Sequence, residues 1–135
     1  MTDSERQLLD AVLDTIIPPS TDGRLPGAGE VGLGAAVQQA MAGAVEPGLA
    51  ALPADFAELP VAERQAALEG LGTSQPGFVP GLLFHSYVGY YQDARVVEAL
   101  GLEARPPFPK GYDMEPNDLT LLDAVRQRPS MVRET

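Results

Sequence analysis

Residues 78–102 read FVPGLLFHSYVGYYQDARVVEALGL, and this stretch decides the fold. Its apolar and aromatic side chains recur at three- and four-residue spacing, which is the period of an α-helix. Pro80 is tolerated because it falls in the first turn. The stretch therefore predicts a long helix that carries a dense aromatic group. The side chains expected on one face are Leu83, Tyr87, Tyr90 and Tyr91, with Phe84 and Val88 alongside.

The same stretch predicts a second, short helix at its end. Asp93 is expected to begin this helix, which continues through Val96, Val97 and Leu100. Gly101 ends it, because glycine readily adopts the left-handed conformation that closes many helices.

Upstream, residues 4–17, SERQLLDAVLDTII, predict an opening amphipathic helix. Ser4 is expected to cap this helix, and Pro18-Pro19 stops it because neither proline can donate a backbone hydrogen bond. The loop that follows contains GAGEVG at residues 27–32, which matches the spacing of a dinucleotide-binding loop. That fingerprint needs a preceding strand, whereas a helix and two prolines precede it here. We therefore interpret the glycines as a tight turn that leads into a helix.

Two more helices are expected between this loop and the aromatic stretch. One runs from residue 30 or 31 to about residue 51, and Pro47-Gly48 divides or ends it. The other begins near Pro60, because proline suits a first helical turn, and covers residues 60–71.

We predict an all-α fold, a single compact helical domain of about five to six helices over residues 1–135, because no stretch alternates like a half-buried strand. Residues 104–117, ARPPFPKGYDMEPN, form an irregular Pro-rich segment, since four prolines prevent a helix or a central strand. A final short helix over residues 119–128 follows, capped by Asn117 or Asp118.

The composition excludes several classes of function. Nine Lys and Arg against nineteen Asp and Glu give a net charge of -10, which repels nucleic acid and an anionic membrane surface. No window holds the ~20 apolar residues of a spanning helix, so we expect no membrane insertion. The absence of cysteine excludes disulfides and thiolate chemistry. Residues 76–135 are nearly balanced, with eight acidic and six basic side chains, so a partner is expected to dock there.

His85 is the only side chain that ordinarily titrates near neutral pH, and its surroundings give it no catalytic partner. Ser86 is its neighbour on a helix and points in another direction. No metal-ligating side chain lies three or four positions from His85, so no metal site is expected. We expect no catalytic residue and no bound cofactor, and we place His85 at a core boundary or in an interface.

The aromatic side chains and the Pro-rich segment allow two interpretations. The rings fill the space between helices, as aromatic side chains commonly do. Alternatively they form a docking surface, since tyrosine and arginine are enriched in interfaces and a polyproline-like strand loses little entropy on binding. The candidate partner-interface residues are His85, Tyr87, Tyr90, Tyr91, Arg105, Phe108 and Tyr112.

Three blocks of the chain, in order, resemble one protein family. LLDAVLDTIIPPSTDGRLPGAGEVGL, residues 8–33, resembles the start of gluconate 2-dehydrogenase subunit 3 proteins. FAELPVAERQAALEGL, residues 56–71, resembles their middle, and HSYVGYYQDARVVEALGLEARPPFPKGYDM, residues 85–114, resembles their C-terminal portion.

The resemblance implies a small accessory subunit that is itself non-catalytic and holds no cofactor. Such a subunit assembles with a large FAD-dependent dehydrogenase subunit of the glucose–methanol–choline type, which oxidises sugars or sugar acids, and stabilises or matures it. Many family members start with a twin-arginine signal, whereas no Arg-Arg pair occurs in this sequence. We therefore expect the chain as printed to be cytoplasmic, or to be exported together with a partner.

Two other classes of function stay open at this point. A stand-alone helical domain could bind a small molecule, or act as an enzyme, through a pocket formed by His85 and the tyrosines. A self-associating structural protein would instead form a closed homo-oligomer.

Overall fold

The structure is a computed structural model that describes residues 1–106, 108–111 and 113–128. The internal contacts of the chain divide it into two units, Met1–Ala104 and Arg105–Thr135. The described residues form helices and no strand, which confirms the predicted all-α fold. The expectation of one domain over residues 1–135 stays a prediction.

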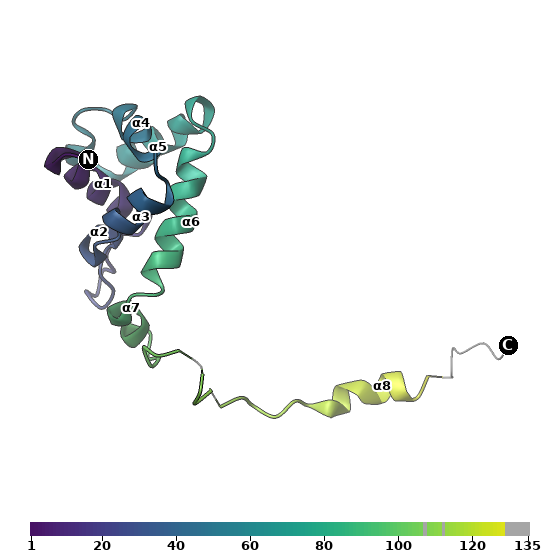
Figure 1. The fold of residues 1–135 in the computed structure, drawn as a ribbon. Coiled ribbons are helices and arrows are strands. Elements are labelled where there is room, and N and C mark those ends of the chain that lie inside the picture. Colours follow the sequence, from purple (N-terminus) through teal and green to yellow (C-terminus); the bar gives the residue numbers. More distant parts are fainter. Residues whose placement is uncertain (107, 112, 129–135) are drawn as a thin grey trace. The chain divides into compact units, whose positions relative to one another are not determined.

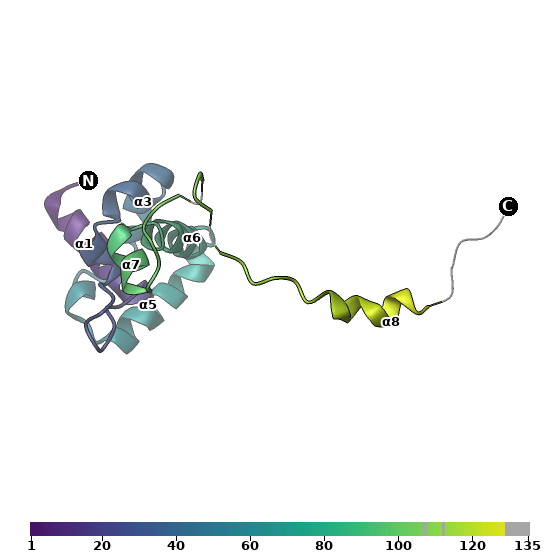
Figure 2. The same ribbon diagram turned by 90° about the horizontal axis from the view of Figure 1, so that it is seen from below.

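The first unit is a helical bundle in which α1, Asp3–Ile16, contacts all the longer helices, and α6, Phe78–Tyr90, packs against them. Helix α6 is the one that carries the aromatic group predicted from the sequence. This helix runs along one edge of the unit and contacts α1, α3 and α5, which all lie to the same side of it (Figures 1 and 2). Within the described ranges, no helix combines the length and the apolar character that crossing a membrane requires. The elements of the unit are α1 Asp3–Ile16, α2 Ala28–Val31, α3 Gly34–Ala40, α4 Val45–Ala50, the 3-10 helix η1 Phe56–Glu58, α5 Val61–Ser74, α6 Phe78–Tyr90 and α7 Ala94–Ala99.

Helix α1 lies within one residue of its predicted bounds, but a different residue caps it. Thr2, and not Ser4, is the N-cap. The Glu5 backbone N–H donates to Thr2 Oγ1 at 3.3 Å, and the Thr2 backbone N–H donates to Glu5 Oε2 at 2.6 Å. This reciprocal capping box satisfies donors that the first helical turn would otherwise leave unpaired.

The helix predicted over residues 30–51 is divided into shorter pieces by two glycines. Gly32 and Gly43 have φ angles of +83° and +81°, in the left-handed region where side chains with a Cβ are strained. They separate α2 from α3 and α3 from α4. Pro47, where a division was expected, lies instead in the first turn of α4, where its missing N–H is tolerated.

The GAGEVG loop packs against α1. The Gly29 backbone N–H donates to Asp14 Oδ1 at 2.8 Å. A Cβ at Gly29 would lie 2.7 Å from the backbone oxygen of Asp10, and a Cβ at Gly27 would collide with the Asp14 carboxylate. The glycines therefore allow α2 to approach α1 closely, which agrees with the interpretation of a turn that leads into a helix.

One hydrophobic core joins all these elements. Helix α1 enters it along its full apolar face, and α6 contributes from its inner side. Gly48 makes room for the ring of Phe78, because a Cβ at that position would collide with it. The buried apolar side chains are Leu9, Val12, Leu13, Ala28, Leu33, Val37, Met41, Val45, Leu49, Leu52, Phe56, Leu68, Leu71, Phe78, Leu82, Tyr90 and Val96.

The ends of α7 agree with the prediction from sequence. The Asp93 side chain accepts a hydrogen bond from the Arg95 backbone N–H at 2.9 Å, as an N-cap does. Gly101 follows the C-cap with a φ of +79°. Arg95 also donates to the backbone oxygen of Val31 at 3.0 Å, which fastens α7 to the end of α2.

The second unit contains a short helical segment, η2 Leu119–Leu122 followed by α8 Asp123–Arg126. Asp118, one of the two predicted caps, accepts from the Thr120 backbone N–H at 3.0 Å. The described residues between 104 and 117 form neither helix nor strand, as their prolines predict.

Candidate functional site

Helix α6 presents apolar side chains on its outer side as well as on its inner side. Phe78, Leu82, Ser86 and Tyr90 face the core, whereas five large apolar or aromatic side chains are exposed. They recur at the spacing of one helical face. We call this surface the α6 face; it consists of Leu83, Phe84, Tyr87, Val88 and Tyr91.

The α6 face carries no charge. Residues 78–91 include no Asp, Glu, Lys or Arg, although residues 1–104 contain fourteen acidic and four basic side chains. Phe84 is 64% exposed and Tyr91 is 55% exposed. A contiguous apolar surface on an otherwise acidic unit is typical of a protein-binding site.

The three neighbouring tyrosines are held in one chain of contacts. Tyr90 is 2% exposed, and its hydroxyl donates to the backbone oxygen of Pro26 at 2.7 Å. The ring of Tyr91 meets Tyr90 edge to face, with 5.4 Å between the centroids. The rings of Tyr87 and Tyr91 lie parallel within 9°, with centroids 6.3 Å apart. The buried ring thus fixes the position of two exposed ones.

The structure separates Tyr90 from its two neighbours among the predicted interface tyrosines, Tyr87 and Tyr91. Tyr87 and Tyr91 lie on the α6 face, whereas Tyr90 belongs to the core. Burial is the main cause that raises the pKa of Tyr90 above its ordinary value of 10.0, and the nearby Tyr91 adds to this shift. Tyr90 is therefore a core side chain in this structure.

His85 lies half-buried at the border of the α6 face. Its ring makes an edge contact with Phe84, with centroids 5.1 Å apart and planes at 84°. In the described ranges, no group of three or more His, Asp or Glu side chains is placed to hold a metal ion. The position of His85 fits both the core-boundary and the interface interpretation.

The other predicted interface residues belong to the second unit. Arg105 donates to the backbone oxygens of Pro106 at 3.2 Å and Gly111 at 2.7 Å. Phe108 is 84% exposed. Tyr112 lies outside the described residues.

Sequence reasoning placed Leu83, Phe84 and Val88 on or beside the aromatic face but did not count them among the interface residues. The structure exposes all three together with Tyr87 and Tyr91. The sequence does show that α6 is apolar all round and free of charge, a pattern that a surface helix rarely shows, but this pattern does not tell which side chains are exposed.

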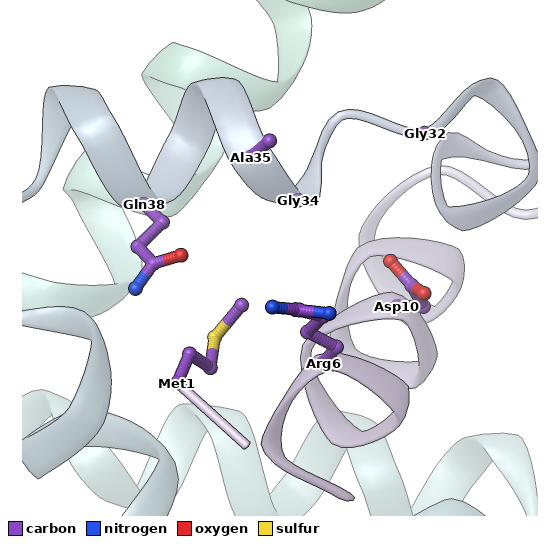
Figure 3. A pocket seen from close by; sticks show the side chains of 7 residues that line it. All are labelled: Met1, Arg6, Asp10, Gly32, Gly34, Ala35 and Gln38. Atoms are coloured by element: carbon purple, nitrogen blue, oxygen red, sulfur yellow. The ribbon is translucent and has the colours of Figure 1, made fainter. Parts of the chain in front are cut away.

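A separate cavity of about 420 Å³ lies in the first unit. The side chains of Met1, Arg6 and Gln38 extend into it from the chain start, α1 and α3, and Asp10 lies on its α1 wall (Figure 3). Burial, and then the charge of Asp14, raise the pKa of Asp10 above its ordinary value. The lining of the cavity is mixed polar and apolar, and it brings no histidine or hydroxyl beside the Asp10 carboxyl.

Comparison with known protein families identifies the family of this chain. The sequence model of gluconate 2-dehydrogenase subunit 3 matches residues 3–94, which is more than half of the chain. The chain belongs to the gluconate 2-dehydrogenase subunit 3 family. The family name describes one subunit of a dehydrogenase complex, which implies a partner subunit. Searches of curated proteins and of solved structures gave no match.

The family match and the candidate site overlap. Residues 3–94 span helices α1 to α6 and include the whole α6 face. The resemblance noted in the sequence extends further, to Met114, whereas the match ends at Ala94, the first residue of α7. The α6 face thus lies in the part of this gluconate 2-dehydrogenase subunit 3 protein that the family model covers.

Proposed function

We propose that this gluconate 2-dehydrogenase subunit 3 protein is a non-catalytic subunit that binds and stabilises a flavin-dependent sugar or sugar-acid dehydrogenase through the α6 face. Membership in the family supports the part of the proposal that concerns a dehydrogenase complex and a partner subunit. The observation that carries the proposal is the α6 face itself, five uncharged side chains exposed on a helix that also forms the core.

Burial of this face against a partner supplies a free energy of association. Each large apolar side chain that leaves water contributes roughly 1.5–3 kcal/mol before the costs of association are subtracted. Tyrosine is enriched among the residues that dominate interfaces, and the α6 face has two. Because the α6 backbone is already anchored in the core, little of it needs ordering on binding.

The non-catalytic role is supported by the chemistry of the groups that the structure gathers. The side chains of Asp10, Arg6 and Gln38 bring one carboxyl, one guanidinium and one amide to the cavity beside α1, and Met1 also lines it. The Gln38 amide nitrogen already donates to Glu46 Oε1 at 3.0 Å. Paired carboxyls with divergent pKa values mark many acid–base sites, and this cavity supplies a single carboxyl. We assign the oxidation step to the partner subunit.

Co-purification from cells that make the partner tests the proposal. The tagged chain is expected to retain a flavoprotein with sugar-oxidising activity, whereas the isolated chain is expected to be colourless and to oxidise no sugar. Sugar oxidation by the isolated chain would contradict the proposal, and so would the absence of any flavoprotein from the purified material.

A matched pair of variants tests the α6 face. Val88 on this face is 43% exposed, and Val61 on α5 is 53% exposed and outside it. Val88→Asp is expected to lose the flavoprotein, because it places a charge in an apolar interface, while Val61→Asp retains it. Both variants should keep the circular dichroism of the parent. Equal retention by the two variants would remove the α6 face from the interface.

A further inference from the structure

We propose that the parallel rings of Tyr87 and Tyr91 bind an arginine side chain of the dehydrogenase subunit. This inference rests on the proposed function, because it names the chemistry that the partner brings to the α6 face. The two rings form a platform at the C-terminal end of α6, and we call this pair the tyrosine platform.

The tyrosine platform is fixed before any partner arrives. Tyr91 rests edge to face on Tyr90, and Tyr90 is held by burial and by its hydrogen bond to Pro26. Tyr87 lies one helical turn earlier and stacks on Tyr91. Rings that are already placed lose little side-chain entropy on binding, so the platform is prepared for a flat group to stack on it.

Electrostatics favour a cation on this platform. The face of an aromatic ring is the negative part of its quadrupole, and a guanidinium stacks on it more readily than other charged groups. The C-terminal end of a helix adds a partial negative charge, and Tyr91 is the C-cap of α6. The surrounding unit, residues 1–104, has a net charge of -10. Each of these fields attracts a positive side chain.

Charge also distinguishes a dehydrogenase subunit from a second copy of this chain. Two copies of residues 1–104 would bring together two units of charge -10, and these repel each other. A partner that presents an arginine within an apolar surface matches both the apolar side chains of the α6 face and its tyrosine platform. Its apolar side chains cover Leu83, Phe84 and Val88, and its guanidinium covers the tyrosine platform.

Affinity measurements with the purified dehydrogenase subunit and the full chain test this inference. Tyr91→Leu removes the ring and is expected to weaken binding roughly tenfold to thirtyfold, the range for a desolvated cation on an aromatic face. Tyr91→Phe keeps the ring and should stay within about threefold of the parent. Phe84→Leu, the matched loss of a ring elsewhere on the α6 face, should cost less than Tyr91→Leu.

A second measurement uses the free chain and needs no partner. The chain has four tyrosines and no tryptophan, so its ultraviolet emission comes from tyrosine. N-acetyl-arginine amide is expected to change this emission in the parent and not in Tyr91→Leu. N-acetyl-lysine amide at the same concentration, as the control for charge alone, should change it less.

Three outcomes would overturn the inference. Tyr91→Leu and Phe84→Leu could weaken binding equally, which would mean that apolar area alone matters. The arginine probe could change the tyrosine emission of the parent no more than the lysine probe does, and no more than it changes that of Tyr91→Leu. Light scattering could show a homodimer that Tyr91→Leu dissociates, which would make a second copy the occupant. If no dehydrogenase subunit binds the parent at all, the proposed function fails, and the emission experiment still tests the platform.

Discussion

Tyr90 links two parts of the first unit that are distant in sequence. Its hydroxyl on α6 donates to Pro26 in the loop after α1, and its ring supports the exposed Tyr91. On an ideal helix Tyr90 lies only about 20° from the direction of Leu83, which is exposed. The helical period therefore could not decide which side Tyr90 would take. The neighbouring loop decides it, and no local pattern encodes where that loop lies.

The raised pKa of Tyr90 makes a prediction about stability at high pH. Because the folded pKa lies above the unfolded one, the folded state holds this proton longer. The contribution of Tyr90 to the free energy of unfolding is therefore fully present below pH 10 and is lost as the pH rises through the folded pKa. Tyr90→Phe should lower stability at pH 7 by about 1 kcal/mol, the typical net value of one hydrogen bond.

Urea denaturation at pH 7 and at several values above pH 10 checks this expectation. The difference in stability between the parent and Tyr90→Phe should shrink as the pH rises, because only the parent has a phenol to ionise at this position. Tyr91→Phe serves as the control on an exposed ring. Parallel pH profiles for the parent and Tyr90→Phe would contradict the assignment of the buried, hydrogen-bonded phenol.

At the scale of elements, the close approach of α2 to α1 depends on Gly29. A Cβ there would lie 2.7 Å from the backbone oxygen of Asp10, which cannot move without moving α1. Gly29→Ala is expected to destabilise the unit by about 1–3 kcal/mol, as overpacking does. Thermal or urea unfolding measures the loss.

Gly70 is the matched control for this substitution. It lies within α5 and has open space where a Cβ would stand. Gly70→Ala should stabilise the unit by about 0.5–1 kcal/mol, because alanine loses less backbone entropy than glycine in a helix. If Gly29→Ala were as harmless as Gly70→Ala, close packing of α2 on α1 would not be the reason for that glycine.

The elements that the sequence predicts best are those with strong local signals. The first helix is bounded by a double proline, and α7 by Asp93 and Gly101, so their extents come out within a residue or two. The helix bounds in residues 30–51 are not predicted correctly, because the sequence does not reveal whether a glycine adopts a positive φ. The choice of Thr2 over Ser4 as a cap follows from Glu5, which pairs only with the former.

The same contrast holds for the candidate site. The aromatic group on residues 83–91 is visible in the sequence, and two of its three tyrosines lie on the exposed face. The full extent of the α6 face is not visible, because a helix that is apolar all round gives no period by which to separate a buried side from a solvent side. Only the packing of α1, α3 and α5 on one side of α6 makes that distinction.

At the scale of the whole molecule, the two units differ in charge. Residues 1–104 have a net charge of -10, whereas residues 105–135 have five acidic and five basic side chains. Phe108 and Met114 in the second unit are both strongly exposed. We expect the removal of such exposed side chains to leave the helicity of the chain unchanged.

The double substitution Phe108→Ala with Tyr112→Ala tests whether the Pro-rich segment also binds the partner. We expect a loss on the order of 2–4 kcal/mol of association if these rings are anchors, with helicity unchanged. Co-purification with the dehydrogenase, together with circular dichroism, measures both quantities. Met114→Ala is the control at an exposed apolar position of the same unit. Unaltered association would exclude this segment from the interface, and a collapse of helicity would place the two rings in a core.

The α6 face has a consequence for how a cell must produce this protein. Five large apolar side chains of this subunit stay exposed to water until the partner binds. Copies made in excess of the partner therefore keep this surface exposed. Surfaces of this kind are what chaperones and proteases recognise, so surplus copies should be degraded and the steady-state level should follow that of the partner. We expect matched synthesis of the two polypeptides, and a short cellular half-life for this one when the other is deleted.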